Sequence, residues 1–173
     1  QVFKDFCIKT GVDVIPEYSE EDIAHSKADY PVLVKPVDSR GSRGQTICYS
    51  KDEVEQAVAL AKRESKSGQV IIEKYLVRMH DFSASYLVID GEPILIRTVD
   101  RYLGRVEDGL DRQLILALLP SRFTGMYIEK VEPHVVNLIK TLGIKNGPIF
   151  IQGFIDGDTV RFYDPALRFA GTE

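Results

Sequence analysis

Several features that would narrow the range of functions are scarce in this sequence. It has no tryptophan, only two cysteines, and no apolar run of the roughly 18 residues that a bilayer-spanning helix needs. We therefore expect no membrane partner. Cys7 and Cys48 do not have the spacing of metal ligands, which favours two free thiols and a reducing, cytoplasmic location. The stretch before Gly11 carries charges and lacks the apolar core of a secretory signal peptide.

An excess of charge of one sign is missing as well. The 173 residues include 22 lysines and arginines against 26 aspartates and glutamates, which gives a net charge of −4. So small an imbalance gives no general attraction to nucleic acid, and we expect no nucleic-acid partner. With 44% hydrophobic and 28% charged residues, the composition is typical of a soluble globular protein with one domain or two small lobes.

Apolar periodicity predicts both helices and strands. The clearest helix is expected over residues 51–66, where apolar residues recur on one helical face. Ser50 and Glu53 predict a capping box at its start, and residues 12–18 are expected to form an extended linker. Further helices are predicted over residues 1–10, 20–27 and 131–142, and strands over residues 32–35, 69–76, 82–88, 94–98, 114–119, 149–155 and 159–163.

Two turn sequences indicate the fold class. Asp90-Gly91 and Asp156-Gly157 each lie between apolar segments that alternate as strands do, which predicts two β-hairpins. Because hairpins join antiparallel strands, the expected fold class is α+β with a mostly antiparallel sheet. We expect a small lobe that ends near Leu76 and a larger sheet lobe after it.

A strand that ends in a lysine is followed by a cationic loop. Lys35 closes the apolar strand, and residues 38–44 (DSRGSRG) contain two glycines and two arginines. Glycines let backbone N–H groups approach an anion closely, and the arginines add positive charge, so the loop is a candidate phosphate site. A mobile surface loop with an exposed lysine explains the same residues. RNA binding is disfavoured, because no aromatic platform for base stacking adjoins the loop.

Three later segments give the sequence a family resemblance. They are VIIEKYL (70–76), DFSASYLVIDGEPIL (81–95) and TLGIKNGPIFIQGFIDGDTVRFYDPALR (141–168). In this order, after the lysine strand and the glycine loop, they resemble the ATP-grasp family, which includes carbamoyl phosphate synthetase and biotin carboxylase. The resemblance covers nearly the whole sequence from Val2 onward.

The resemblance implies the ATP-grasp fold, in which a nucleotide lies between two lobes of mostly antiparallel sheet with helices. It also implies a fragment that lacks the family's N-terminal domain and is incomplete at its C-terminal end. The expected division is a helix and linker over residues 1–29, a small lid lobe over 30–76 and a larger lobe over 77–173.

Nucleotide-binding roles follow from the same resemblance. Lys35 matches the lysine that contacts ATP phosphates, and Glu73 matches the hinge residue that accepts from the adenine amino group. Asp81 matches the acidic residue that holds the ribose hydroxyls. Without the resemblance, Glu73 and Asp81 are more simply a solvated strand-end carboxylate and a turn residue. The phosphate flap and the rest of the hinge comprise Ser39, Gly41, Ser42, Arg43, Gly44, Lys74, Tyr75 and Leu76.

The metal motif of the family is only partly present. Gln152 and Asp164 match two of its ligand positions, whereas Ala166 stands where the family has an asparagine. Two oxygen ligands suffice for Mg²⁺, or Mn²⁺, when ATP phosphates and water supply the rest, and one ion is favoured over two. Arg168 matches the catalytic arginine that stabilises the transferring phosphoryl group. On the residues alone, Asp164-Pro165 is equally a strand terminator.

These roles imply an ATP-dependent ligase similar to carbamoyl phosphate synthetase. ATP activates a small-molecule carboxylate as an acyl phosphate, and an amine or thiol attacks it. The alternative is a degenerate nucleotide-binding or regulatory module without turnover, which Ala166 favours. Arg97 and Arg101 lie where family members meet the acceptor substrate, or are surface residues of a sheet. The partners expected are small molecules, and a homodimer is compatible with the resemblance.

Overall fold

A computed structural model describes residues 2–38, 43–77, 79–104 and 114–171. The described residues divide into two compact units. The larger unit takes them from Gln1–Val14, Arg78–Leu103 and Leu114–Glu173, and the smaller unit takes them chiefly from Ile15–Val77. Each unit has a hydrophobic core of its own.

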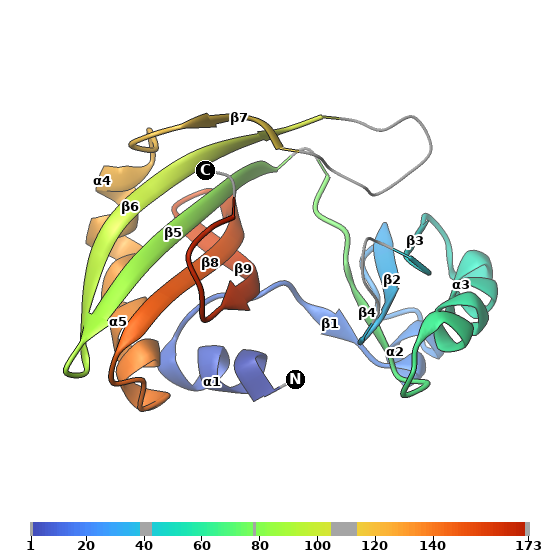
Figure 1. The fold of residues 1–173 in the computed structure, drawn as a ribbon. Helices are drawn as coiled ribbons and strands as arrows, with labels where there is room; N and C mark the ends of the chain where they lie inside the picture. The colour runs from blue at the N-terminus through green and yellow to red at the C-terminus, as the bar shows by residue number, and fades with distance from the viewer. Residues whose placement is uncertain (1, 39–42, 78, 105–113, 172–173) are drawn as a thin grey trace. The chain divides into compact units, whose positions relative to one another are not determined.

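A five-stranded antiparallel sheet forms the larger unit, with the strand order β7-β6-β5-β8-β9 (Figure 1). Asp90 and Gly91 both have positive φ at the β5–β6 turn, and Gly157 does at the β8–β9 turn, as expected of tight hairpins. The strands are β5 (His80–Ile89), β6 (Glu92–Leu103), β7 (Leu114–Leu118), β8 (Gly147–Asp156) and β9 (Thr159–Ala166).

The two faces of this sheet have different chemistry. Strand alternation turns Phe82, Ala84 and Tyr86 of β5 into the core, where helices pack over them (Figure 1). The other face, which we call the polar face, carries Asp81 and Ser83 of β5 together with polar residues of β6, β8 and β9. The helical elements of this unit are α1 (Val2–Thr10), α4 (Thr124–Met126), the π-helix η1 (Tyr127–Val131) and α5 (Glu132–Thr141).

Both hairpins of the larger unit contain a β-bulge. In the first, the register passes from Tyr86↔Leu95 to Ser85↔Arg97, so Ile96 is the extra residue. In the second, it passes from Gly153↔Phe162 to Gln152↔Asp164, and the extra residue is Tyr163. Each bulge shifts by one residue every pair that lies farther from its turn.

The smaller unit has a four-stranded sheet in the order β1-β4-β2-β3, with α3 packed against it. The apolar face of α3 supplies Val54, Ala57, Val58 and Ala61 to the core, as its periodicity predicts. The elements are β1 (Glu17–Tyr18), α2 (Glu20–Ala24), β2 (Val32–Pro36), β3 (Thr46–Cys48), α3 (Lys51–Glu64) and β4 (Val70–Lys74).

The α+β fold class with antiparallel sheets is confirmed, and three local predictions need correction. The capping box at the start of α3 is wrong, because the Glu53 carboxylate accepts from the Ser50 hydroxyl and from the Tyr49 N–H. The chain becomes helical at Thr124, before the predicted 131–142 helix, because η1 runs directly into α5. Part of the expected linker pairs with β4 as the strand β1.

Candidate functional site

The smaller unit brings two of the predicted nucleotide-binding residues into contact. Lys35 on β2 and Glu73 on β4 lie on adjacent strands, and Lys35 Nζ donates to Glu73 Oε1 at 2.5 Å. The Glu73 side chain is 4% exposed and that of Lys35 is 22% exposed. A pair this far from water is held by both charges, so removing either one leaves the other in a poorly solvated position.

In the predicted hinge, two backbone N–H groups are already hydrogen-bonded within the protein and are not available to a ligand. The Lys74 N–H donates to the Pro16 carbonyl at 2.9 Å, and the Tyr75 N–H donates to the Pro31 carbonyl at 2.9 Å. The Lys74 ammonium pairs with Asp29 at 2.7 Å. Leu76 is buried. The N–H groups of Lys74 and Tyr75 are therefore committed within this unit.

The two ends of the predicted phosphate loop are anchored at the C-terminal end of α3. Asp38 accepts from the Ser65 hydroxyl at 2.7 Å, and two backbone N–H groups after it also donate to this carboxylate. These hydrogen bonds, that from Ser65 first, lower the pKa of Asp38. Gly44 has a φ of 72°, and a Cβ there would lie 2.8 Å from the Cβ of Glu64. Arg43 is exposed, whereas Ser39, Gly41 and Ser42 lie outside the described residues.

On the polar face of the larger unit, Asp81 is at the centre of a buried hydrogen-bonded group. Its Oδ1 accepts from Arg101 Nη1 at 3.0 Å, and its Oδ2 accepts from the Tyr163 hydroxyl at 3.1 Å. The Asp81 side chain is 4% exposed and that of Arg101 is 12% exposed. Burial, with the negative charge of Asp81 beside it, raises the pKa of Tyr163 well above the ordinary value, so its hydroxyl remains a donor.

The two predicted metal ligands are register partners on β8 and β9. The amide orientation of Gln152 that satisfies both neighbours lets its nitrogen donate to Asp164 Oδ2 at 3.1 Å. Its oxygen then accepts from Nη1 and Nη2 of Arg101. Oxygen ligands suit Mg²⁺, and Asp164 fits that chemistry. The Gln152 oxygen does not fit while Arg101 occupies both of its lone pairs.

Arg168 lies beyond the end of β9 and is exposed. Its guanidinium stands 5.6 Å from the centroid of the Phe150 ring, and its Nη1 donates to the Phe169 carbonyl at 2.9 Å. Phe150 precedes Gln152 by two residues on β8, so strand alternation turns both side chains to the polar face. Arg168 is thereby held on the face that carries Gln152 and Asp164.

In the larger unit the structure thus joins the predicted residues Asp81, Gln152 and Asp164 in one hydrogen-bonded cluster, and in the smaller unit it pairs Lys35 with Glu73. Arg101 and Tyr163, which also belong to the cluster in the larger unit, were not predicted as partners of Asp81. Their signal in the sequence is weak, since Arg101 was considered only as an acceptor-site or surface residue. Among the described residues, no group of three or more His, Cys, Asp or Glu side chains has the geometry of a metal site.

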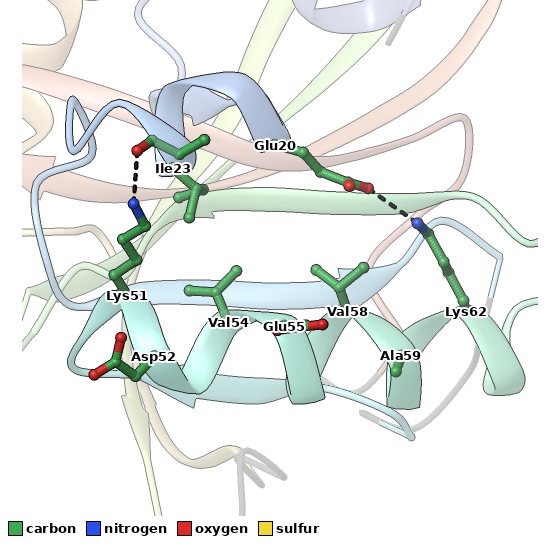
Figure 2. A pocket seen from close by; sticks show the side chains of 10 residues that line it. Glu20, Ile23, Lys51, Asp52, Val54, Glu55, Val58, Ala59 and Lys62 are labelled. Carbon is green, nitrogen blue, oxygen red and sulfur yellow. Dashed lines mark hydrogen bonds and ion pairs between the residues drawn. The ribbon is translucent and has the colours of Figure 1, made fainter.

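The smaller unit also contains a groove of about 480 Å³ between α2 and α3 (Figure 2). Ile23, Val54 and Val58 line its apolar part. Two lysines at its rim have partners within the unit: Lys62 contacts Glu20 at 3.0 Å, and Lys51 donates to the Ala24 carbonyl. None of the residues predicted to bind nucleotide lines this groove.

Comparison with known proteins identifies the family. Residues 4–147 match the family described as Carbamoyl-phosphate synthase L chain, ATP binding domain. The chain belongs to this family and is an ATP-grasp domain, which confirms the resemblance seen in the sequence.

Several curated relatives span most of the chain at moderate identity. A formate-dependent phosphoribosylglycinamide formyltransferase of Prochlorococcus marinus is 28% identical over 87% of this chain. A carbamoyl phosphate synthase large chain of Streptomyces coelicolor is 27% identical over 90% of it. The matches cover 38% and 14% of those proteins respectively, so the chain corresponds to only part of each relative.

Solved structures share the fold. The biotin carboxylase of Campylobacter jejuni, in complex with β-γ-ATP, matches 98% of this chain with a TM-score of 0.82 at 18% identity. The biotin carboxylase domain dimer of Hydrogenobacter thermophilus 2-oxoglutarate carboxylase, in complex with MgADP, ADP and bicarbonate, gives a TM-score of 0.79 at 23% identity. The matches cover 40% and 39% of those chains.

In the part of the chain that the structure describes, no helix is both long enough and apolar enough to cross a membrane.

Proposed function

We propose that this chain binds ATP and forms part of an ATP-dependent ligase that joins a carboxylate to an amine or thiol. The observation that carries the proposal is the ion pair between Lys35 and Glu73, two positions that the family uses for nucleotide. Because the buried carboxylate already holds the Lys35 side chain in place, binding of a phosphate to this lysine costs less side-chain entropy. Curated relatives that act as ligases, including a D-alanine–D-alanine ligase, support this class of activity.

In the proposed reaction, the carboxylate attacks the γ-phosphorus of ATP and ADP leaves, which gives an acyl phosphate. The amine or thiol then displaces phosphate from the acyl carbon. Lys35 binds the nucleotide phosphates, and Arg168 stabilises charge on the transferring group from the polar face. Asp164 would hold Mg²⁺, or Mn²⁺, together with the phosphates, and the ion would neutralise charge on their oxygens.

Related proteins support the remaining parts of the proposal. The biotin carboxylase domain from Hydrogenobacter forms a dimer that holds MgADP and bicarbonate. By analogy, we propose that a small carboxylate accepts the phosphoryl group of ATP. We also propose a homodimeric assembly and a cytoplasmic location for this protein.

Replacing Lys35 tests the proposal directly. Lys35→Ala removes a charge-assisted phosphate contact of about 1.5–3 kcal/mol, so the Kd for ATP should rise roughly ten- to hundredfold. Isothermal titration calorimetry in the presence of Mg²⁺ measures this. Lys62→Gln is the matched control, because it removes a lysine from the same unit at an exposed ion pair. An unchanged Kd in Lys35→Ala, or no ATP binding by the wild type at millimolar nucleotide, contradicts the proposal.

Because Lys35 supports the buried Glu73 carboxylate, the variant's fold needs a check. The double variant Lys35→Met/Glu73→Gln removes both charges and leaves no buried ion unpaired. It should retain the wild-type circular dichroism spectrum and still lose affinity for ATP. A double variant that folds and binds ATP as tightly as the wild type would count against the assignment of Lys35.

A nucleotide-binding module without turnover is the second candidate. Two observations favour it, namely Ala166 at the third ligand position and the engagement of Gln152 by Arg101. The two candidates differ in ADP release. Ligase activity predicts ADP release above the protein-free rate with some pair from a panel of small carboxylates with amines or thiols, whereas a binding module predicts ATP binding without release.

A further inference from the structure

We propose that the Arg101 guanidinium takes the place of a divalent cation beside Gln152, so that a fixed arginine supplies positive charge to the polar face in this chain. The part of this inference that concerns phosphate binding rests on the proposed function. The part that concerns metal exclusion does not, because it is a property of the larger unit alone.

The first step is the hydrogen bonding of Gln152. Its side-chain oxygen accepts from Nη1 and from Nη2 of Arg101, the latter at 2.9 Å. A carbonyl oxygen has two lone pairs, and both are directed at one guanidinium. The fork of the arginine matches this arrangement, as it does with carboxylates. No lone pair of this oxygen is left for a metal ion in this conformation.

The second step is the immobility of Arg101. The same guanidinium donates to Asp81 Oδ1 at 3.0 Å, and Asp81 is fixed in turn by the Tyr163 hydroxyl. Arg101 is therefore held by acceptors on two strands, β5 and β8, and its side chain is 12% exposed. Withdrawing it from Gln152 would strip the buried Asp81 carboxylate of a positive partner. Binding of a metal at Gln152 thus opposes an ion pair already formed.

The positive charge of Arg101 also disfavours a metal ion beside Gln152. A guanidinium keeps its proton at every pH that the folded protein experiences, so its positive charge is permanent. A divalent cation placed against the Gln152 oxygen would lie within a few ångströms of that charge and be repelled. Asp164 is different, because only one of its oxygens, Oδ2, accepts from Gln152. The arrangement leaves room for one ion at Asp164 and replaces the other with Arg101.

Metal binding without nucleotide tests the exclusion. The matched pair is Asp81→Asn against Asp81→Asn/Arg101→Gln. The two variants differ only in the guanidinium, and neither leaves a buried carboxylate unpaired. Mn²⁺ is titrated into the isotope-labelled proteins, and paramagnetic broadening of backbone amide resonances reports where it binds. Because an ion at Asp164 would already lie close to Gln152, the readout is the Mn²⁺ concentration required. We expect the Gln152 and Gly153 amides to broaden at an about tenfold lower Mn²⁺ concentration in the double variant than in Asp81→Asn. Equal broadening in both, or none in either, overturns the proposal.

Nucleotide binding tests the replacement of the ion by the arginine. We compare the Kd for ADP with excess Mg²⁺ and with EDTA in the wild type, Arg101→Gln and Arg101→Lys. Lys140→Gln on the exposed side of α5 is the charge-matched control. We expect removal of Mg²⁺ to weaken ADP binding about threefold or less in the wild type and control, and about tenfold or more in Arg101→Gln. Arg101→Lys should lie between, because it keeps the charge and loses the fork.

These results separate the two proposals. A wild type that binds no nucleotide under any condition contradicts the proposed function, while the Mn²⁺ experiment still decides whether Arg101 excludes metal. If Arg101→Gln responds to Mg²⁺ removal as the wild type does, the arginine does not stand in for an ion. If the affinity of the wild type for ADP itself falls tenfold or more without Mg²⁺, the proposal that Arg101 replaces an ion is likewise overturned.

Discussion

The two cysteine side chains are fully buried, Cys7 on α1 and Cys48 on β3. Burial raises the pKa of the Cys7 thiol to about 12 and that of the Cys48 thiol to about 11. The thiolate is the reactive form, so at pH 8 well under one per cent of either group is poised to react.

We therefore expect both thiols of the native protein to be nearly inert toward a disulfide reagent such as DTNB. In denaturant both should react at the rate of an ordinary exposed cysteine. The measurement is the absorbance of the released thiol over time at pH 8, with and without urea. A native thiol that reacts within seconds would show that one of the two sites opens far more readily than its burial indicates.

Asp100 is a buried carboxylate on β6 whose protonation should govern part of the acid sensitivity. Burial by itself would raise the pKa of Asp100, but donation from the Ser121 hydroxyl at 2.5 Å and from the Arg122 N–H outweighs it, and the pKa is lowered. A lowered pKa in the folded state means that the ionised group stabilises the fold above its unfolded pKa, about 3.9. This stabilisation is lost as the pH falls through the folded-state pKa.

Asp100→Asn should be less stable than the wild type at pH 7 by about 1.5–3 kcal/mol, the usual contribution of hydrogen bonds to a charged group. Below pH 4 the difference should shrink, because the wild-type carboxyl becomes neutral too. Urea unfolding at pH 7 and pH 3 measures both values. A difference that stays constant across this range would show that the Asp100 charge is not what stabilises the site.

At the level of elements, the π-helix η1 is tied to the sheet by one buried hydrogen bond. The Tyr127 hydroxyl on η1 lies 2.6 Å from the Tyr86 hydroxyl on β5, and both side chains are fully buried. Burial raises the pKa of Tyr86 and Tyr127 above the ordinary value, so both hydroxyls stay neutral. Each is the partner that keeps the other from being an unsatisfied polar group in the core.

Tyr86→Phe and Tyr127→Phe should each cost about 1–3 kcal/mol, because each leaves one buried hydroxyl without this partner. The double variant removes both hydroxyls and should cost clearly less than the sum of the two single changes. Urea unfolding of the four proteins completes the cycle. Additive effects would mean that the two hydroxyls are solvated or bonded independently of each other.

The hairpins of the larger unit were predictable from the sequence, but their bulges were not. Turn chemistry and alternation were enough to predict both hairpins of the larger unit and the helix α3. Counting back from the Asp90-Gly91 turn in a regular hairpin, however, places Asp81 opposite Asp100. The bulge at Ile96 moves Arg101 into that place. The alternation of apolar residues along a strand does not indicate where an extra residue lies. The ion pair between Asp81 and Arg101 at the centre of the polar face therefore could not be predicted.

The candidate site was predictable to a similar degree. Position-by-position resemblance located Lys35, Glu73, Gln152 and Asp164, and the structure brings them together in pairs within each unit. The resemblance gave no sign that these groups are partnered by one another. Side-chain pairing depends on strand register and burial, which the sequence specifies only through the completed fold.

Across the chain, the described residues contain two separate cores. Ile72 belongs to the core of the smaller unit, and Leu138 to that of the larger unit. Since buried apolar contacts stabilise each unit from within, the units should open with free energies of their own.

Ile72→Ala should lower the opening free energy of the smaller unit by about 2–5 kcal/mol and leave the larger unit near its wild-type value. Leu138→Ala should do the reverse. Native-state hydrogen exchange, read at the slowest amides of β4 and β8, measures the two units in one experiment. If either substitution lowers the protection of both strands equally, the chain unfolds as a single cooperative unit.

The two bulges have a further consequence for how this chain tolerates change. Each sets the phase of its strand, so the site depends on the number of residues between turn and site as well as on their identity. Deleting Ile96, the extra residue, would leave Arg101 opposite Asp81, whereas inserting one residue directly after Arg97 would slide Asp100 opposite Asp81 and set two carboxylates against each other. Deleting Tyr163 would bring Asp164 into regular alternation after Phe162 and remove a donor from Asp81. A single-residue insertion after Arg97 is therefore expected to be far more damaging than a substitution there, whereas deletion of Ile96 should preserve the register of the site.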